Sequence, residues 1–227
     1  GFSLSFDGSV EEIWMAFSNG STLVVPTPEA PRFGADLGSY LTELGVTYFS
    51  TVPTMLATID SVPSLRTVVL SGEVCPPELV RRWARDDLRL LNVYGPTEAT
   101  VNTTIAECLP DRPVTIGRPL RGYDLHIVDE DLIPVPPGTK GELLVSGPTL
   151  ARGYHNQPEL TAKQFVTDVP IDGVDRAYRT GDLVRLGEDG NLEFFGRIDT
   201  QVKIRGYRVE LAEIESVLRE DPQVREA

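Results

Sequence analysis

The chain has 227 residues, of which 41% are hydrophobic and 24% are charged, a composition typical of a globular protein with a substantial core. Its 34 acidic side chains outnumber 21 basic ones, and the resulting formal charge of −13 argues against nucleic acid or anionic lipid as a partner. Two cysteines and two histidines are too few for a disulfide framework or a structural zinc site, and no apolar run reaches the roughly 20 residues that span a membrane. We expect a cytoplasmic protein, because so few cysteines suit a reducing compartment.

Residues 1–112 alternate between helix-like and strand-like segments. Ser9 and Glu12 are spaced as a capping box, which predicts the start of a helix. Further helices are predicted before Gly45 and after Pro76. Short apolar runs predict strands at residues 21–26, 46–50, 67–71 and 88–93. This alternation favours an α/β architecture with a mostly parallel sheet.

Residues 113–198 show a different pattern, in which short strand-like runs are separated by turns rich in glycine, proline and aspartate. The predicted strands lie at residues 124–128, 141–145, 183–186 and 192–195. One helix is predicted at 158–165, so we expect a β-rich, barrel-like portion. Residues 199–227 contain one strand pattern and one helix pattern, which together are too short to bury a core of their own.

Seven short strings follow one another along the chain. They are Phe-Asp-Gly-Ser-Val-Glu-Glu at 6–12, Leu-Ser-Gly-Glu at 70–73, Asn-Val-Tyr-Gly-Pro-Thr-Glu-Ala-Thr at 92–100, Gly-Glu-Leu at 141–143, Ala-Arg-Gly-Tyr at 151–154, Tyr-Arg-Thr-Gly-Asp-Leu at 178–183 and Gly-Arg-Ile-Asp-Thr-Gln-Val-Lys-Ile-Arg-Gly-Tyr-Arg at 196–208. In this order and spacing they resemble the adenylation domains of nonribosomal peptide synthetases, which belong to the adenylate-forming superfamily of acyl-CoA synthetases and luciferases. The resemblance covers nearly the whole chain.

The resemblance implies the fold of an adenylate-forming enzyme. Residues 1–112 would be the α/β part of the large core, with a mixed sheet, and residues 113–198 its β-rich part. Residues 199–227 would be the hinge and the first strand and helix of a small C-terminal lid. The implied chemistry joins an amino acid to ATP in the presence of Mg²⁺, giving aminoacyl-AMP and pyrophosphate. The aminoacyl group then passes to the phosphopantetheine thiol of a peptidyl carrier protein domain.

The string at 92–100 holds most of the residues that the resemblance assigns to the nucleotide. Tyr94 offers an aromatic face on which adenine stacks, and Asn92 would contact the adenine edge. Thr97 would donate to the α-phosphate, and Glu98 offers a hard oxygen ligand for Mg²⁺, which makes these two the catalytic candidates. Gly72 would let the backbone approach the purine, because glycine has no Cβ. Taken alone, so short a string is better explained as a Gly-Pro turn with an exposed glutamate, and the other strings reverse that balance.

Three residues near the end of the core complete the implied nucleotide site. Asp182 would accept hydrogen bonds from the ribose hydroxyls, a common use of a carboxylate in nucleotide sites. Arg197 would approach the nucleotide, and Asp199 would mark the hinge of the lid. The competing interpretations are a turn-stabilising aspartate for Asp182 and a surface ion pair for Arg197 and Asp199.

The resemblance also assigns an amino-acid pocket. Its selectivity positions fall on Asp7, Gly8, Glu11, Ser50, Val69, Ser71, Val93, Val101 and Asn102. Asp7 would pair with the α-ammonium group, although an acid at a helix start is also favourable in itself. Glu11 departs from an otherwise small and apolar lining and favours a basic substrate such as lysine or ornithine. The competing interpretation places Glu11 in the first helical turn, facing water.

Two elements of the resembled family fall outside the sequence. Its phosphate-binding loop is expected upstream of Phe6, and the catalytic lysine of its lid downstream of Ala227. We therefore expect this chain alone to be inactive, and to dimerise through apolar surface that the core leaves exposed. Two other functions stay open: an acyl-CoA or aryl-acid ligase of the same superfamily, and a non-catalytic nucleotide-binding or interaction piece.

Overall fold

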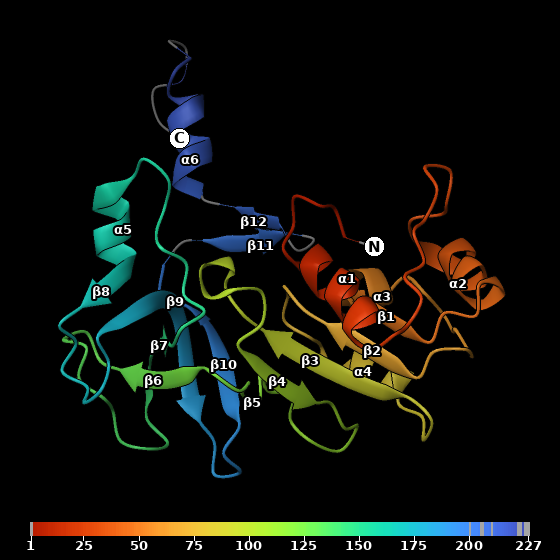
Figure 1. Cartoon of the computed structure of the whole chain (residues 1–227), viewed down its shortest axis with the longest axis horizontal. Helices are drawn as coiled ribbons and strands as arrows, with labels where there is room; N and C mark the ends of the chain where they lie inside the picture. Colours follow the sequence, from red (N-terminus) through yellow and green to blue (C-terminus); the bar gives the residue numbers. More distant parts are fainter. Residues whose placement is uncertain (1, 200, 205–206, 210, 222–223, 225–227) are drawn as a thin grey trace.

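A computed structural model describes residues 2–199, 201–204, 207–209, 211–221 and 224. Two five-stranded sheets lie side by side, the first formed by the N-terminal part of the chain and the second by the part that follows (Figure 1). A short hairpin and helix α6 lie above the junction of the two sheets in that view. Helices and strands alternate only in the first half, as the sequence predicted.

The first sheet is mixed, with the strand order β1-β2-β3-β4-β5. Its strands are β1 (Tyr48–Thr51), β2 (Thr67–Leu70), β3 (Arg89–Tyr94), β4 (Thr104–Glu107) and β5 (Arg118–Pro119). The first three strands are parallel, and β4 and β5 add to them in antiparallel fashion. The carboxyl ends of β2 and β3 therefore lie at the same edge, where Ser71 and Tyr94 stand.

The helices of this part are α1 (Gly8–Ser18), α2 (Gly34–Glu43), α3 (Pro53–Leu56) and α4 (Pro77–Trp83). One face of the sheet packs against α2, α3 and α4, because Val68 and Leu90 share a buried cluster with apolar side chains of these helices. Successive strand residues alternate between faces, so Val69 and Val93 lie on the opposite face together with Tyr48. A hydrogen bond from Tyr48 to Glu11 connects that face to α1.

Two local predictions in this part are wrong. Helix α1 begins at Gly8 with Asp7 as its N-cap, and the Glu12 carboxylate accepts the backbone N–H of Phe2 at 2.8 Å instead of closing a capping box with Ser9. Residues 21–26 do not form a strand, and Val25 is 74% exposed. An apolar run becomes a buried strand only where a neighbouring strand pairs with it, and this segment has no such neighbour among the described residues.

The second sheet is antiparallel, with the order β10-β9-β7-β6 and with β8 paired to β9. Its strands are β6 (Asp124–Val128), β7 (Lys140–Ser146), β8 (Phe165–Thr167), β9 (Arg176–Leu186) and β10 (Leu192–Arg197). Helix α5 (Pro158–Gln164) precedes β8. The β-rich part and its single helix are thus confirmed.

The last described segment is a two-stranded hairpin followed by a helix. Strand β11 (Val202–Ile204) pairs with β12 (Tyr207–Val209), and α6 (Leu211–Leu218) follows. The single strand expected here is therefore two strands, and residues 205–206 between them lie outside the described part. In the portion of the chain that is described, none of the helices has the length and apolar character needed to cross a bilayer.

Backbone hydrogen bonds hold the two sheets together. The Ile116 N–H donates to the Leu192 carbonyl at 2.9 Å, and the Leu192 N–H donates to the Gly117 carbonyl at 2.7 Å. Tyr94 and Ile116 from the first sheet and its neighbouring loop share a buried cluster with Val184 of β9. This contact fixes how the carboxyl end of β3 faces β9, which is where the cavity described below lies.

We expect Gly117→Ala to destabilise the protein more than Gly122→Ala. Both glycines have left-handed φ angles, +84° and +94°, which cost an alanine about 1–2 kcal/mol. At Gly117 the new methyl group would also collide with the Ile105 carbonyl, whereas nothing lies within 4 Å at Gly122. Urea unfolding followed by fluorescence of the buried Trp83 measures the difference, which we expect to exceed ~2 kcal/mol. Equal losses in the two variants would contradict the close approach of Gly117 to the β4 backbone at Ile105.

Candidate functional site

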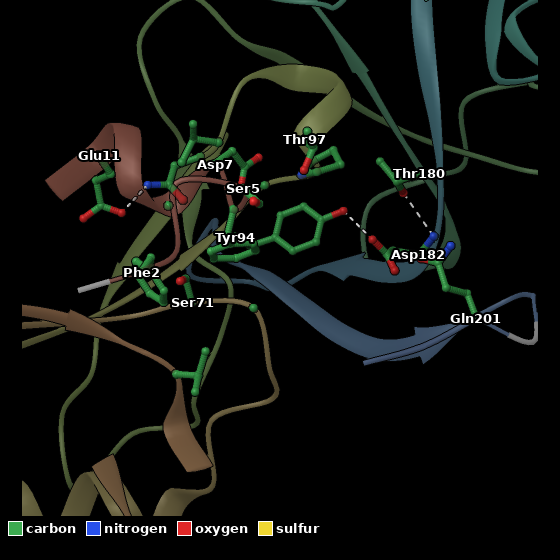
Figure 2. Close-up of a pocket in the computed structure, with 18 of the residues that line it drawn as sticks. Phe2, Ser5, Asp7, Glu11, Ser71, Tyr94, Thr97, Thr180, Asp182 and Gln201 are labelled. Atoms are coloured by element: carbon green, nitrogen blue, oxygen red, sulfur yellow. Dashed lines mark hydrogen bonds between the residues drawn. The ribbon is translucent and has the colours of Figure 1, made fainter. Parts of the chain in front are cut away.

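A cavity of about 260 Å³ lies where the start of α1 and the carboxyl ends of β2 and β3 meet β9 and β10. The carboxyl edge of parallel strands is the usual place for a ligand in an α/β sheet. The lining includes most of the residues predicted from the sequence, namely Asp7, Gly8, Glu11, Ser71, Gly72, Tyr94, Thr97, Val101, Asn102, Asp182 and Arg197. Figure 2 shows Glu11 on one side of the cavity and Asp182 on the other, with the Tyr94 ring between them.

Six predicted residues are not part of this lining: Asn92, Glu98, Asp199, Ser50, Val69 and Val93. Asn92 lies on the face of the sheet opposite Val93, where its side-chain amide donates to the Thr115 carbonyl at 2.8 Å. Val69 and Val93 are buried in the sheet face that also carries Tyr48, and Ser50 is buried opposite Val69 in the strand register. The binding roles assigned to these residues stay predictions.

The Tyr94 hydroxyl links the two sheets through Asp182. It donates to Asp182 Oδ2 at 2.5 Å, and Arg197 Nη1 donates to Asp182 Oδ1 at 2.8 Å (Figure 2 shows the first of these bonds). Arg197 also forms a two-pronged pair with Asp199, both bonds being 2.6 Å long. Burial and the negative charge of Asp182 raise the pKa of Tyr94, so the hydroxyl stays a donor.

The Thr-Gly-Asp string forms a bulge within β9, where the register with β7 shifts, and it needs glycine at its centre. Gly181 has a φ of +70°, and a Cβ there would lie only 2.8 Å from Arg197 Nη2 and 2.9 Å from Asp199 Oδ2. The buried Glu142 carboxylate accepts the Gly181 N–H at 3.1 Å and pairs with Arg179 at 2.6 Å. The Gly-Glu-Leu string on β7 therefore holds the bulge that presents Asp182.

The turn after β3 is strained and brings the chain back to the cavity. Thr100 and Val101 have φ angles of +67° and +66°, which is unfavourable for residues branched at Cβ. A Cβ on Gly95 would collide with the Val101 carbonyl, so only glycine permits this return. Bonds from Thr100 Oγ1 to the Thr149 carbonyl, 2.6 Å, and from the Thr103 N–H to the Tyr94 carbonyl, 2.8 Å, hold the conformation.

Glu98 is buried beside this turn. Its Oε1 accepts the Tyr154 hydroxyl at 2.5 Å, and its backbone carbonyl accepts the Ala151 N–H at 2.8 Å. In the part of the chain that the structure describes, no three His, Cys, Asp or Glu side chains gather as a metal cage. Mg²⁺ is commonly held by one or two carboxylates together with phosphate oxygens, so a single glutamate fits the donor set of a Mg²⁺–nucleotide site.

Two carboxylates at the start of α1 line the other end of the cavity. Asp7 is the N-cap residue, yet its side chain makes no capping hydrogen bond. Glu11 follows four residues later and accepts bonds from the Tyr48 hydroxyl at 2.5 Å and from Asn102 Nδ2 at 3.0 Å. Neither carboxylate pairs with a lysine or arginine among the described residues. The cavity therefore carries two negative charges without a cationic partner from residues 2–199.

The sequence reasoning missed two tyrosines that act on acidic site residues. Tyr48 lies two residues before Ser50, and the two-residue period of a strand places both side chains on one face, a signal that was available in the sequence. Tyr154 ends the Ala-Arg-Gly-Tyr string, but nothing in the sequence connects it to Glu98. Such a contact between residues 56 positions apart becomes visible only in the folded chain.

Comparisons with known proteins agree on one family. The family described as AMP-binding enzyme matches residues 2–155. Phosphinothricin tripeptide synthetase PhsC of Streptomyces viridochromogenes is 47% identical over 99% of this chain and 21% of its own length. PA1221, an NRPS protein containing adenylation and PCP domains, superposes with a TM-score of 0.90 at 32% identity, over 100% of this chain and 48% of that one. The Vibrio cholerae adenylation domain AlmE, in complex with glycyl-adenosine-5'-phosphate, has a TM-score of 0.83 at 33% identity, covering 98% and 44%. The chain thus spans about a fifth of PhsC and less than half of either solved structure.

We expect Tyr94→Phe to lower the free energy of unfolding at neutral pH by about 1.5–3 kcal/mol, the range for a hydrogen bond to a charged group. The folded-state pKa of Tyr94 is raised above its usual value of 10.0. Its stabilisation is therefore fully present below pH 10 and is lost as the pH rises above 10.

Urea unfolding between about pH 8 and about pH 11 checks this effect: the stability of the unmodified protein should fall more steeply than that of Tyr94→Phe. Tyr40→Phe, on α2 and outside the cavity, is the control. Parallel pH curves for the unmodified protein and Tyr94→Phe would contradict the prediction.

Proposed function

Because the chain belongs to the AMP-binding enzyme family, we propose that it forms part of a site that joins an amino acid to AMP. It is homologous over nearly its whole length to the adenylation domains of nonribosomal peptide synthetases, as the ordered strings predicted. One observation carries the proposal: Tyr94 and Asp182, assigned to the nucleoside, line the same cavity as Asp7, assigned to the amine. A single elongated ligand can therefore touch all three.

In the proposed complex, the adenine of ATP packs against the Tyr94 ring, and the ribose hydroxyls donate to Asp182. Each carboxylate oxygen has two lone-pair directions, so Asp182 can accept from the ribose while it keeps its bonds to Tyr94 and Arg197. The Asp7 carboxylate pairs with the α-ammonium group of the amino acid. AlmE, which is described in complex with glycyl-adenosine-5'-phosphate, supports a ligand of this type.

The proposed first step is attack of an amino-acid carboxylate oxygen on the α-phosphorus of ATP. A new P–O bond to the amino acid forms, and the bond to the leaving pyrophosphate breaks, so that aminoacyl-AMP results. Thr97 lines the cavity and would donate its hydroxyl to an α-phosphate oxygen as negative charge develops there. Glu98 would supply one oxygen ligand to Mg²⁺, which neutralises phosphate charge when it is bound.

A second step would transfer the aminoacyl group to a phosphopantetheine thiol on a peptidyl carrier protein. PA1221 contains both adenylation and PCP domains, which supports such a partner. Arg197 lies at the end of β10 and connects Asp182 to Asp199. We place the hinge of the lid at Asp199, with the divisions 1–112, 113–198 and 199–227 as proposed units. A cytoplasmic location is proposed as well, and both cysteines are free thiols.

We propose that the amino acid carries a second, basic amino group, as in lysine or ornithine. Asp7 is the N-cap of α1 and Glu11 follows four residues later, a spacing that puts their Cβ atoms about 5–6 Å apart on one side of the helix start. Both line the cavity, which argues against the interpretation that Glu11 only faces water. A substrate with two ammonium groups separated by a short alkyl chain would neutralise both carboxylates.

Two further properties of the chain are proposed. We propose that the chain alone does not form aminoacyl-AMP at the rate of a full adenylation domain, which fits its coverage of less than half of PA1221 and AlmE. We also propose that it self-associates through the outer face of α1. Trp14 and Phe17 are 64% and 59% exposed there, and Val10 lies one turn before Trp14.

Titration calorimetry with 5′-O-(lysylsulfamoyl)adenosine, a stable mimic of lysyl-AMP, tests the proposed site. We expect the chain to bind the mimic, and Asp7→Asn to weaken binding by about tenfold or more, because the ammonium group loses its counter-ion. Asp36→Asn, an exposed acid in the first turn of α2, is the matched control. In a pyrophosphate-exchange assay, the unmodified chain should show no turnover.

Three results would contradict parts of this picture. Failure of both AMP and the mimic to bind would exclude the nucleotide site. Equal binding of the mimic by Asp7→Asn and the unmodified chain would exclude the ammonium role. Rapid pyrophosphate exchange by the chain alone would overturn the proposed inactivity.

The preference for a basic side chain is tested with Glu11→Gln, which keeps the shape of the side chain and removes its charge. The unmodified chain should bind the lysyl mimic at least ~10-fold more tightly than the norleucyl mimic, which has the same alkyl chain without the second ammonium group. Glu11→Gln should remove most of that ratio. Glu159→Gln, in the first turn of α5, should leave it unchanged. A norleucyl preference in the unmodified chain would contradict the proposed substrate class.

A further inference from the structure

Tyr48 is the first residue of β1, and it contacts Glu11 from outside the cavity. Its side chain is half-buried and does not belong to the cavity lining. Its hydroxyl donates to Glu11 Oε1 at 2.5 Å across 37 residues of sequence. Tyr48 therefore lies behind the carboxylate, on the side away from a bound ligand.

Asn102 completes the fixation of Glu11. Its Nδ2 donates to Glu11 Oε2 at 3.0 Å, so within the described part of the chain each carboxylate oxygen has one donor. Two bonds to two different oxygens, from β1 and from the turn after β3, define the plane of the carboxylate. Each oxygen keeps a lone-pair direction for one more donor.

Both donors are neutral, so the negative charge of Glu11 is retained. An arginine or lysine in place of Tyr48 would cancel this charge and remove the attraction for a cation. Burial, followed by the negative charge of Glu11, raises the pKa of Tyr48 above its usual value, so the hydroxyl remains protonated and keeps donating. Tyr48 and Glu11 together thus present a fixed carboxylate anion to the cavity.

We propose that Tyr48 is a positioning residue for substrate selection, which acts by holding the Glu11 carboxylate in the orientation that receives a cationic side chain. The inference rests on the proposed function of the site and adds a residue to it. Without the Tyr48 hydroxyl, Glu11 would keep its charge but would rotate about its side-chain bonds, with Asn102 as its remaining donor among the described residues. Selectivity would fall while binding of the AMP portion would persist.

Tyr48→Phe tests the proposal, because it removes one oxygen atom and keeps the aromatic ring. Calorimetry gives the ratio of the affinities for the lysyl and norleucyl sulfamoyl-adenosine mimics. We expect Tyr48→Phe to lower this ratio about three- to tenfold, mainly through the lysyl mimic, and to leave the affinity for AMP unchanged. Tyr40→Phe, on α2 and outside the cavity, is the control: it also removes a tyrosine hydroxyl and should leave the ratio unchanged.

A double-mutant cycle separates positioning from a structural effect. If Tyr48 acts through Glu11, adding Tyr48→Phe to Glu11→Gln should not lower the ratio further. An unchanged ratio in Tyr48→Phe alone would overturn the inference, as would an equal drop with and without the Glu11 carboxylate. If the unmodified chain binds neither AMP nor either mimic, the proposed function itself fails and this inference fails with it. If it binds both mimics equally, the basic preference fails.

Discussion

The hydrogen bond from Tyr94 to Asp182 is the contact on which the site depends. Tyr94 stands at the carboxyl end of β3 in the first sheet, and Asp182 lies at the bulge within β9 of the second sheet, 88 residues later. The bond is buried, so breaking it would leave a carboxylate with one donor fewer in a poorly solvated place. Because Arg197 joins the same carboxylate, the bond also ties β10 and the approach to Asp199 to the first sheet.

A tyrosine hydroxyl recurs beside the acidic site residues. Tyr48 donates to Glu11, Tyr94 donates to Asp182 and Tyr154 donates to Glu98, each at 2.5 Å. A neutral donor orients a carboxylate and leaves its charge intact. An arginine orients the carboxylate and also cancels its charge. Asp182 is the exception, since Arg197 pairs with it, and this fits a proposed partner that is a neutral sugar hydroxyl. Glu11, for which a cationic partner is proposed, pairs with no arginine or lysine among the described residues.

Two of the ordered strings have contacts that their residue types alone did not suggest. In Gly-Glu-Leu, Glu142 accepts the Gly181 N–H and so fixes the bulge of β9 that carries Asp182. In Ala-Arg-Gly-Tyr, a Cβ on Gly153 would collide with Thr161, and Tyr154 reaches Glu98. The strings are thus linked pairwise in space, which gives a physical reason for their occurring together in one chain.

The sequence by itself determined the alternation of helices and strands in the first part, the β-rich second part, the family and most of the cavity lining. The secondary structure depends on local periodicity and on turn residues such as Gly45, and the family and the lining depend on short strings that are contiguous in the sequence. It misjudged the capping box at Ser9 and the strand at 21–26, because a cap and a strand each need a partner that composition does not supply. Only the tertiary structure decided that Asn92 and Glu98 lie outside the cavity lining and that Tyr48 holds Glu11. Those facts depend on strand register and on contacts between residues far apart in sequence, which the packing of the two sheets determines.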